Sequence, residues 1–289
     1  MSSLNSPEIT QSTLKTTSDL DTKTVVKKHL ESHLGILHRV FQLIGNASYT
    51  RKMAVDLSYR LERLVYLYAD WRLRKTTKQH TPDIQLCGNY YIDVSCVNQH
   101  DIVYSCGVGR NIEFDEALHK AFGCDIHMFD PTPVAVDYMV KVMDRLYLKF
   151  YPWGVWIEDK TMPFYFKKEE KGKLQNLSIT NLFQTTKYLV LDCYSLPTIM
   201  KRLSHNRIDI LKMDIEGTAM PVLEKLMESD ICPRQMIFEL EKGRTPLLEF
   251  HKRMHRLLRQ IESKGYALYF QPRQKKSKYN FQFLAVRDS

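Results

Sequence analysis

Two glycines and a following aspartate have the spacing of a nucleoside-binding turn. Gly107 and Gly109 come directly after the apolar run 102–106, and glycine at such a turn lets a ligand approach backbone N–H groups without a Cβ in the way. Asp130 follows about 20 residues later, the separation at which an acidic side chain reaches a ribose in a strand–helix–strand unit. The third glycine of the dinucleotide motif is missing, so the alternative for the two glycines is an ordinary strand-to-helix turn. The alternative for Asp130 is a helix N-cap before Pro131.

Charged side chains alternate where another apolar run ends. Lys212, Asp214 and Glu216 in ILKMDIEG point to one side while the strand lasts, and ligands bind at the carboxyl edge of a parallel sheet. Glu239 in MIFELE would bring a further carboxylate there if the two strands are neighbours. For a reaction that removes a proton from a bound hydroxyl, Asp214 is the first candidate for the general base, Glu239 is the second, and Lys212 could stabilise the developing alkoxide. A structural ion pair between Lys212 and Asp214 is the alternative.

The elements that must position these residues are short apolar runs alternating with helical patterns. Strands are predicted at 102–106, 125–129, 147–156, 208–213, 235–240, 266–270 and 281–286, and helices at 112–122, 134–146, 219–228 and 247–264. Strands separated by helical crossovers indicate a parallel sheet. The last two strands have only a basic loop between them, which predicts an antiparallel hairpin at the sheet edge. The fold class is therefore α/β, a Rossmann-like, doubly wound, mostly parallel seven-stranded sheet.

The first 80 residues have a different pattern. Residues 1–24 are rich in Ser and Thr and are expected to form a disordered leader. Residues 25–80 carry two apolar stripes of helical period and predict a two-helix extension, which cannot bury both stripes alone and is expected to cover the substrate side of the site. Residues 81–289 form the predicted catalytic domain.

Composition limits the class of protein. Hydrophobic residues make up 44% and charged residues 26% of the 289 residues, an ordinary globular balance. Six scattered cysteines without a C-x-x-C pair indicate reduced thiols and no metal site. The net charge of +9 is compatible with an anionic partner. No run approaches the roughly 20 apolar residues of a membrane span, so a cytoplasmic protein is expected, with an anchor upstream left open.

Four motifs occur in the order shown by one known family. They are GVGRNIEFDEAL at 107–118, FDPTP at 129–133, YPWGV at 151–155 and RIDILKMDIEG at 207–217. Over about residues 84–286 the chain resembles the FkbM-type class I methyltransferases, which include methyltransferase-like proteins of eukaryotes. The resemblance implies S-adenosylmethionine (SAM) as the cofactor.

The resemblance also assigns roles to single residues. In that family the glycine loop and the second-strand acid hold the cofactor, which transfers to Gly107, Gly109 and Asp130. The full set of expected cofactor contacts is Gly107, Val108, Gly109, Asp130, Pro131, Gly154 and Val155. Cys106 and Arg110 differ from the commonest family patterns. The run FELE at 238–241 replaces the Phe-His that often follows the fifth strand, which leaves the acceptor class open.

The expected function is methyl transfer to a hydroxyl of a sugar, glycoconjugate or other small molecule. The hydroxyl specificity is implied by the resemblance alone. One alternative is an RNA ribose 2′-O-methyltransferase, which the charge of +9 would suit, although nucleic acid is not the favoured partner. The other is a catalytically silent SAM-fold protein that binds nucleic acid or a partner through its helical extension. The oligomeric state stays open.

Overall fold

The structure is a computed structural model, and it describes most of the chain after residue 72. The described residues are Leu73, 77–79, 81–142, 148–166, 169–170, 173–174, 177–181, 184–271 and 280–287. The predicted leader, nearly all of the predicted two-helix extension and the basic loop 272–279 therefore lie outside the described residues.

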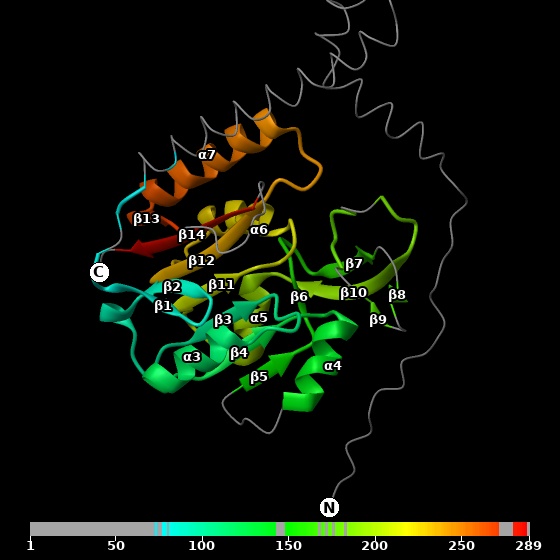
Figure 1. The fold of residues 1–289 in the computed structure, drawn as a ribbon, viewed down its shortest axis with the longest axis horizontal. Coiled ribbons are helices and arrows are strands. Elements are labelled where there is room, and N and C mark those ends of the chain that lie inside the picture. Colours follow the sequence, from blue (N-terminus) through cyan, green and yellow to red (C-terminus); the bar gives the residue numbers. More distant parts are fainter. Residues whose placement is uncertain are drawn as a thin grey trace, which may run out of the picture.

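A seven-stranded sheet forms the centre of the molecule (Figure 1). Its strands, in spatial order, are β13 (Tyr266–Phe270), β14 (Asn280–Arg287), β12 (Gln235–Glu241), β11 (Ile210–Met213), β3 (Val103–Cys106), β4 (Ile126–Phe129) and β5 (Leu148–Tyr151). All neighbours are parallel except β14, which is antiparallel to both β12 and β13. The predicted fold class is confirmed, including the antiparallel hairpin at one edge, whose second strand lies between β13 and the parallel strands.

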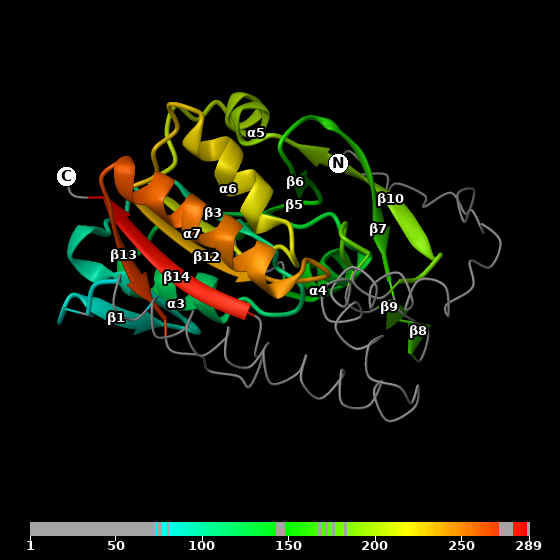
Figure 2. The same ribbon diagram turned by 90° about the horizontal axis from the view of Figure 1, so that it is seen from above.

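Helices cover both faces of this sheet. They are α3 (Glu113–Phe122), α4 (Pro133–Val142), α5 (Leu196–Leu203), α6 (Ala219–Met227) and α7 (Leu247–Ser263). Helices α5, α6 and α7 pack on one face, where Figure 2 shows α6 and α7 side by side, and α3 and α4 pack on the other. Because both faces are covered, the central strands are buried throughout, which explains their nearly continuous apolar sequence.

Several smaller elements accompany the main sheet. A hairpin of β1 (Ile84–Cys87) and β2 (Tyr90–Asp93) packs beside α3 and is followed by a 3₁₀ turn at Val94–Cys96. A second sheet contains β6 (Gly154–Val155), β10 (Tyr188–Tyr194) and β7 (Lys160–Tyr165), and the short strands β8 (Glu169–Glu170) and β9 (Lys173–Leu174) pair with each other.

The single strand predicted at 147–156 is wrong, because its two halves belong to different sheets. The first half is β5 of the main sheet and the second is β6. Pro152 lies between them, and the N–H of Trp153 turns back to the carbonyl of Tyr151 at 2.8 Å. Proline has no N–H for a sheet ladder, so the ladder ends there.

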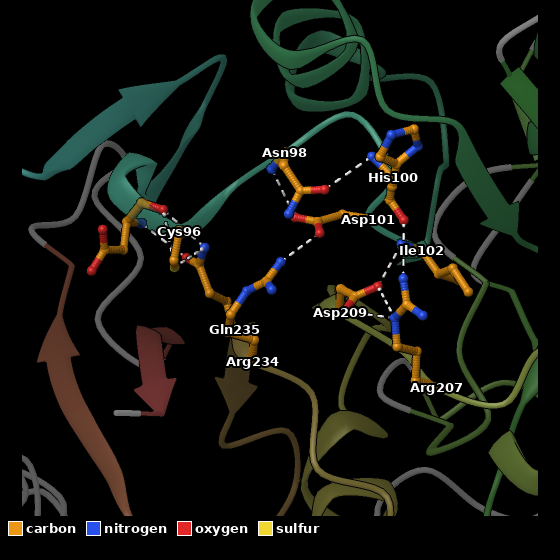
Figure 3. A network of polar contacts seen from close by, with 10 residues as sticks. Cys96, Asn98, His100, Asp101, Ile102, Arg207, Asp209, Arg234 and Gln235 are labelled. Atoms are coloured by element: carbon orange, nitrogen blue, oxygen red, sulfur yellow. Dashed lines mark hydrogen bonds and ion pairs between the residues drawn. The ribbon is translucent and has the colours of Figure 1, made fainter. Parts of the chain in front are cut away.

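A polar network braces the amino edge of the main sheet (Figure 3). Arg234, next to the start of β12, forms an ion pair with Asp101, which is 4% exposed. Asp209, next to the start of β11, accepts hydrogen bonds from the N–H of Ile102 and from the guanidinium of Arg207. The loop before β3 is thereby tied to the starts of β11 and β12.

The chain just before β1 packs on the main sheet. Leu73 is fully buried in the core cluster on the α7 side. The N–H of Lys78 donates to the carbonyl of Leu268 at 2.7 Å, and Lys78 pairs in parallel with Tyr269 of the edge strand β13. The end of the predicted extension therefore contacts the catalytic domain, while the domain division itself stays a prediction.

Candidate active site

Three adjoining cavities lie at the carboxyl edge of the main sheet. Their volumes are about 530, 300 and 70 Å³, and Gly107 and Asp214 line all three. Every residue predicted for the site lines at least one of them, namely Gly107, Val108, Gly109, Asp130, Pro131, Gly154, Val155, Lys212, Asp214 and Glu239. The fold thus brings together side chains from five separate segments of the sequence.

The two glycines of the loop after β3 have different reasons to be glycine. Both have positive φ, +84° at Gly107 and +54° at Gly109. A Cβ on Gly107 would lie 1.8 Å from the carbonyl oxygen of Asp214, so the loop and the end of β11 can meet only without a side chain there. A Cβ on Gly109 would have no neighbour within 4 Å. Packing therefore requires glycine at Gly107, whereas at Gly109 the space beside the backbone is open and the positive φ favours glycine.

Asp130 is directed at the glycine loop. Its Oδ2 accepts hydrogen bonds from the N–H groups of Val108 and Gly109, at 3.0 and 2.9 Å. Its Oδ1 accepts from the N–H and the hydroxyl of Thr132, at 2.9 and 2.6 Å. These four bonds use the roughly four lone-pair directions of a carboxylate. A bound ribose would therefore replace some of the hydrogen bonds between Asp130 and its neighbours. The predicted ribose contact stays a prediction.

Lys212 is almost fully buried at the end of β11. The residue is 3% exposed, and its Nζ donates a hydrogen bond to the carbonyl oxygen of Gly107 at 2.7 Å. The ammonium also lies 5.5 Å from the centroid of the Tyr90 ring. Lys212 and Asp214 both belong to the described residues, and they form no ion pair with each other. The structural ion pair that was the alternative from the sequence is therefore not present.

Asp214 is held by a residue that the sequence did not indicate. Its backbone N–H donates to the carbonyl of Cys106, which fixes the end of β11 against β3. Its Oδ2 accepts a hydrogen bond of 2.6 Å from the hydroxyl of Tyr90. Tyr90 lies on β2, 124 residues away in the chain. No local pattern could have linked the two.

Glu239 lies at the same edge, as predicted. Strands β11 and β12 are parallel neighbours, with Met213 opposite Phe238. Two amides of β14 hold its carboxylate: Asn280 donates to Oε1 at 2.5 Å and Gln282 to Oε2 at 2.7 Å. Burial, followed by the negative charge of Asp214, raises the pKa of Glu239.

Asp115 is a second residue that the sequence analysis missed. It lies in the first turn of α3, is 1% exposed and lines the largest cavity. Its Oδ1 is buried without a hydrogen-bond partner. Burial raises the pKa of Asp115, and the positive charge of Lys212 opposes that rise. The signal was available, because the acid stands between Phe114 and Leu118 on the buried side of an amphipathic helix.

The described residues contain neither a candidate metal site nor a membrane-spanning helix. Among them, no three His, Cys, Asp or Glu side chains are grouped so that they could hold a metal ion. None of the helices in the same part of the chain has the length and apolar character needed to cross a membrane.

Comparisons with known proteins point to one enzyme family. Residues 92–268, more than half of the chain, match the family described as the methyltransferase FkbM domain. No curated protein sequence matches the chain.

Three of the similar solved structures share little sequence with this chain. Precorrin-6y C5,15-methyltransferase from Geobacter metallireducens is 6% identical with a TM-score of 0.38, and the match covers 67% of this chain and 83% of that one. Methanococcus jannaschii fibrillarin, a pre-rRNA processing protein, is 7% identical with a TM-score of 0.41, covering 66% and 67%. Aeropyrum pernix fibrillarin with natively bound SAM is 12% identical with a TM-score of 0.38, covering 65% and 67%. Similarities of this size do not bear on the acceptor.

Proposed function

Because the chain belongs to the FkbM methyltransferase family, we propose that it transfers the methyl group of SAM to a hydroxyl oxygen of a sugar, glycoconjugate or other small molecule. The observation that carries the proposal is the place of Asp214, which borders all three adjoining cavities. A carboxylate at this junction faces both the space for a donor and the space for an acceptor.

The described residues fit SAM. The two smaller cavities, lined between them by Asp130, Pro131 and Gly154, offer polar and apolar walls to an adenosine group. In the largest cavity, Oδ1 of Asp115 offers an unpartnered acceptor to the ammonium of the methionine group, and the ammonium of Lys212 offers a donor to its carboxylate. When bound, the cofactor supplies a methyl group on a positively charged sulfur.

The residues of the chain then have two tasks. The first is to hold the acceptor oxygen in line with the methyl group, and such positioning accounts for much of the acceleration in displacement reactions. The second is to take the hydroxyl proton, for which Asp214 has an oxygen that no described residue engages. Lys212 supplies positive charge near the oxygen that loses the proton.

The charge of the largest cavity favours a neutral acceptor over RNA. Among the described residues that line it are the acids Glu113, Asp115, Asp214 and Glu239 and a single cation, Lys212. A phosphate-bearing chain would meet repulsion there, in spite of the net charge of +9 of the whole protein.

A screen of methyl transfer tests the proposal. Purified protein is incubated with methyl-labelled SAM and with separate pools of glycans, small hydroxyl compounds, lipids and RNA, and Asp214→Asn is the matched control. We expect label in the glycan or small-molecule pools and its loss in the variant. Labelling of RNA alone, with the label located on the ribose by nucleoside analysis, would identify a ribose methyltransferase. Failure of the wild-type protein to bind SAM in calorimetry would leave the silent binding protein.

A further inference from the structure

We infer that Tyr90 is a positioning residue that orients the carboxylate of Asp214, and that Asp214 rather than Glu239 takes the proton. The inference rests on the proposed function. It starts from the hydrogen bond of 2.6 Å between the Tyr90 hydroxyl and Asp214 Oδ2, inside the largest cavity.

The ring of Tyr90 is fixed on both sides. Tyr90 is 3% exposed, and the ring of Phe114 meets it edge-on, with centroids 5.6 Å apart and planes at 85°. The ammonium of Lys212 lies 5.5 Å from its centroid. A buried aromatic ring in such contacts has little rotational freedom, so its hydroxyl is held at one point of the cavity.

The backbone that carries Tyr90 is equally constrained. Gly88, in the turn of the β1–β2 hairpin, has a φ of +58°. A Cβ there would lie 2.5 Å from the backbone of Glu113 at the start of α3. The tip of the hairpin therefore packs directly on the first turn of α3, which places Tyr90 opposite the end of β11.

The two carboxylates of the cavity are held in different ways. Each oxygen of Glu239 accepts a hydrogen bond from an amide of β14, so both of its oxygens are already engaged by the scaffold. At Asp214 only Oδ2 is engaged, by Tyr90, and no described residue bonds to Oδ1. The single donor from Tyr90 thus turns the other oxygen of Asp214 toward the space for the acceptor.

Tyr90 itself is not suited to take the proton. Burial, followed by the charge of Asp214, raises the pKa of the Tyr90 phenol well above its usual range. The hydroxyl therefore keeps its proton at neutral pH and acts as a donor to Asp214. Its contribution is to the geometry of the neighbouring carboxylate.

A double-mutant cycle tests this role. Single-turnover rates are measured with the acceptor found in the methyl-transfer screen for the wild-type protein, Tyr90→Phe, Asp214→Asn and the double variant. We expect Tyr90→Phe to slow the methyl-transfer step about tenfold, to leave the dissociation constant of S-adenosylhomocysteine (SAH) within twofold, and to have no further effect in the Asp214→Asn background. Tyr91→Phe, the next residue of β2, is the control and should leave the rate unchanged.

The outcomes separate the inference from the proposed function. The inference is overturned if Tyr90→Phe slows methyl transfer equally in the wild-type and Asp214→Asn backgrounds, or if weaker SAH binding fully explains the loss of rate. In either case the protein is still a methyltransferase. A wild-type protein that transfers no methyl group overturns the proposed function.

A second measurement needs no acceptor. The ¹³Cζ resonance of Tyr90, assigned with Tyr90→Phe, should shift in Asp214→Asn and not in Asp137→Asn, a change on the exposed side of α4. An unmoved resonance would overturn the inference by itself.

Discussion

The ammonium of Lys212 donates a hydrogen bond of 2.7 Å to the carbonyl oxygen of Gly107. The bond ties the end of β11 to the glycine loop after β3, at the point where the backbone of Asp214 already excludes any side chain from Gly107. Lys212 is 3% exposed, so little water competes for this bond. Its charge therefore acts on the loop as well as on any oxygen that loses a proton nearby.

Lys212→Met should weaken cofactor binding. The substitution removes a buried, charged donor and leaves the carbonyl oxygen of Gly107 without its hydrogen bond. The free energy of cofactor binding should weaken by about 1.5–3 kcal/mol, which is roughly tenfold or more in affinity. Calorimetry with SAH measures the effect, and Lys201→Met on the exposed surface of α5 is the control. Methyl transfer should slow as well. An unchanged affinity would show that the loop does not depend on this bond.

Asp130→Ala should also weaken SAM and SAH binding, by roughly 1–3 kcal/mol. The variant loses the four hydrogen bonds that hold the loop and Thr132, whether or not Asp130 also contacts a ribose. Calorimetry with adenosine separates the two roles, because a ribose contact would reduce adenosine and SAH affinity by the same factor. Wild-type affinity for both ligands would remove Asp130 from the cofactor site.

Asp214→Asn should reduce turnover far more than cofactor affinity. Loss of a general base typically costs about 10²- to 10⁴-fold in rate, and the amide is nearly isosteric, so the fold should survive. Glu239→Gln should cost at least tenfold less, because both Glu239 oxygens are engaged by β14. Single-turnover rates are compared with thermal melts. A rate per folded molecule that matches wild type would end the catalytic assignment of Asp214.

The contribution of His127 to the stability of the protein should fall as the pH drops below about 6.5. Burial, followed by the charges of His205 and Lys149, lowers the pKa of His127 from its usual 6.5 to about 4. Between these values the unfolded chain binds a proton that the folded chain does not, which costs up to about 3 kcal/mol at the acid end. Urea unfolding of the wild-type protein and of His127→Phe at pH 7 and pH 4.5 isolates this contribution from that of the buried acids. On going to pH 4.5 the variant should lose less stability than wild type, or gain more, and an equal pH dependence in the two proteins would contradict the assignment.

Leu73→Ala should destabilise the catalytic domain. Leu73 is fully buried in the core cluster on the α7 side, and large-to-small substitutions at such sites cost about 2–5 kcal/mol. A fragment that begins near residue 80 should be destabilised as well, because it also loses the bond from Lys78 to Leu268. Denaturant unfolding measures both changes. A fragment as stable and as active as the full chain would show that the segment before β1 is dispensable.

The sequence by itself determined the fold class and several residues of the site. Strands that are buried on both faces appear in the sequence as continuous apolar runs. Segments of helical period between such runs predict a parallel sheet. In a parallel sheet the carboxyl ends of β3, β4, β11 and β12 lie at one edge. Gly107, Asp130 and Asp214 could be found because each directly follows such a run. Local spacing is enough for this, since the chain direction at a strand end is fixed by the strand itself.

The tertiary structure alone decided which groups these residues contact. The bond from Tyr90 to Asp214 spans 124 residues, and nothing in the short run around β2 indicates where its hairpin packs. The amides of β14 reach Glu239 only because that strand inserts between β12 and β13. Asp130 faces the loop N–H groups because the turn brings them within 3.0 Å. Such contacts depend on packing between distant segments, which periodicity and spacing do not encode.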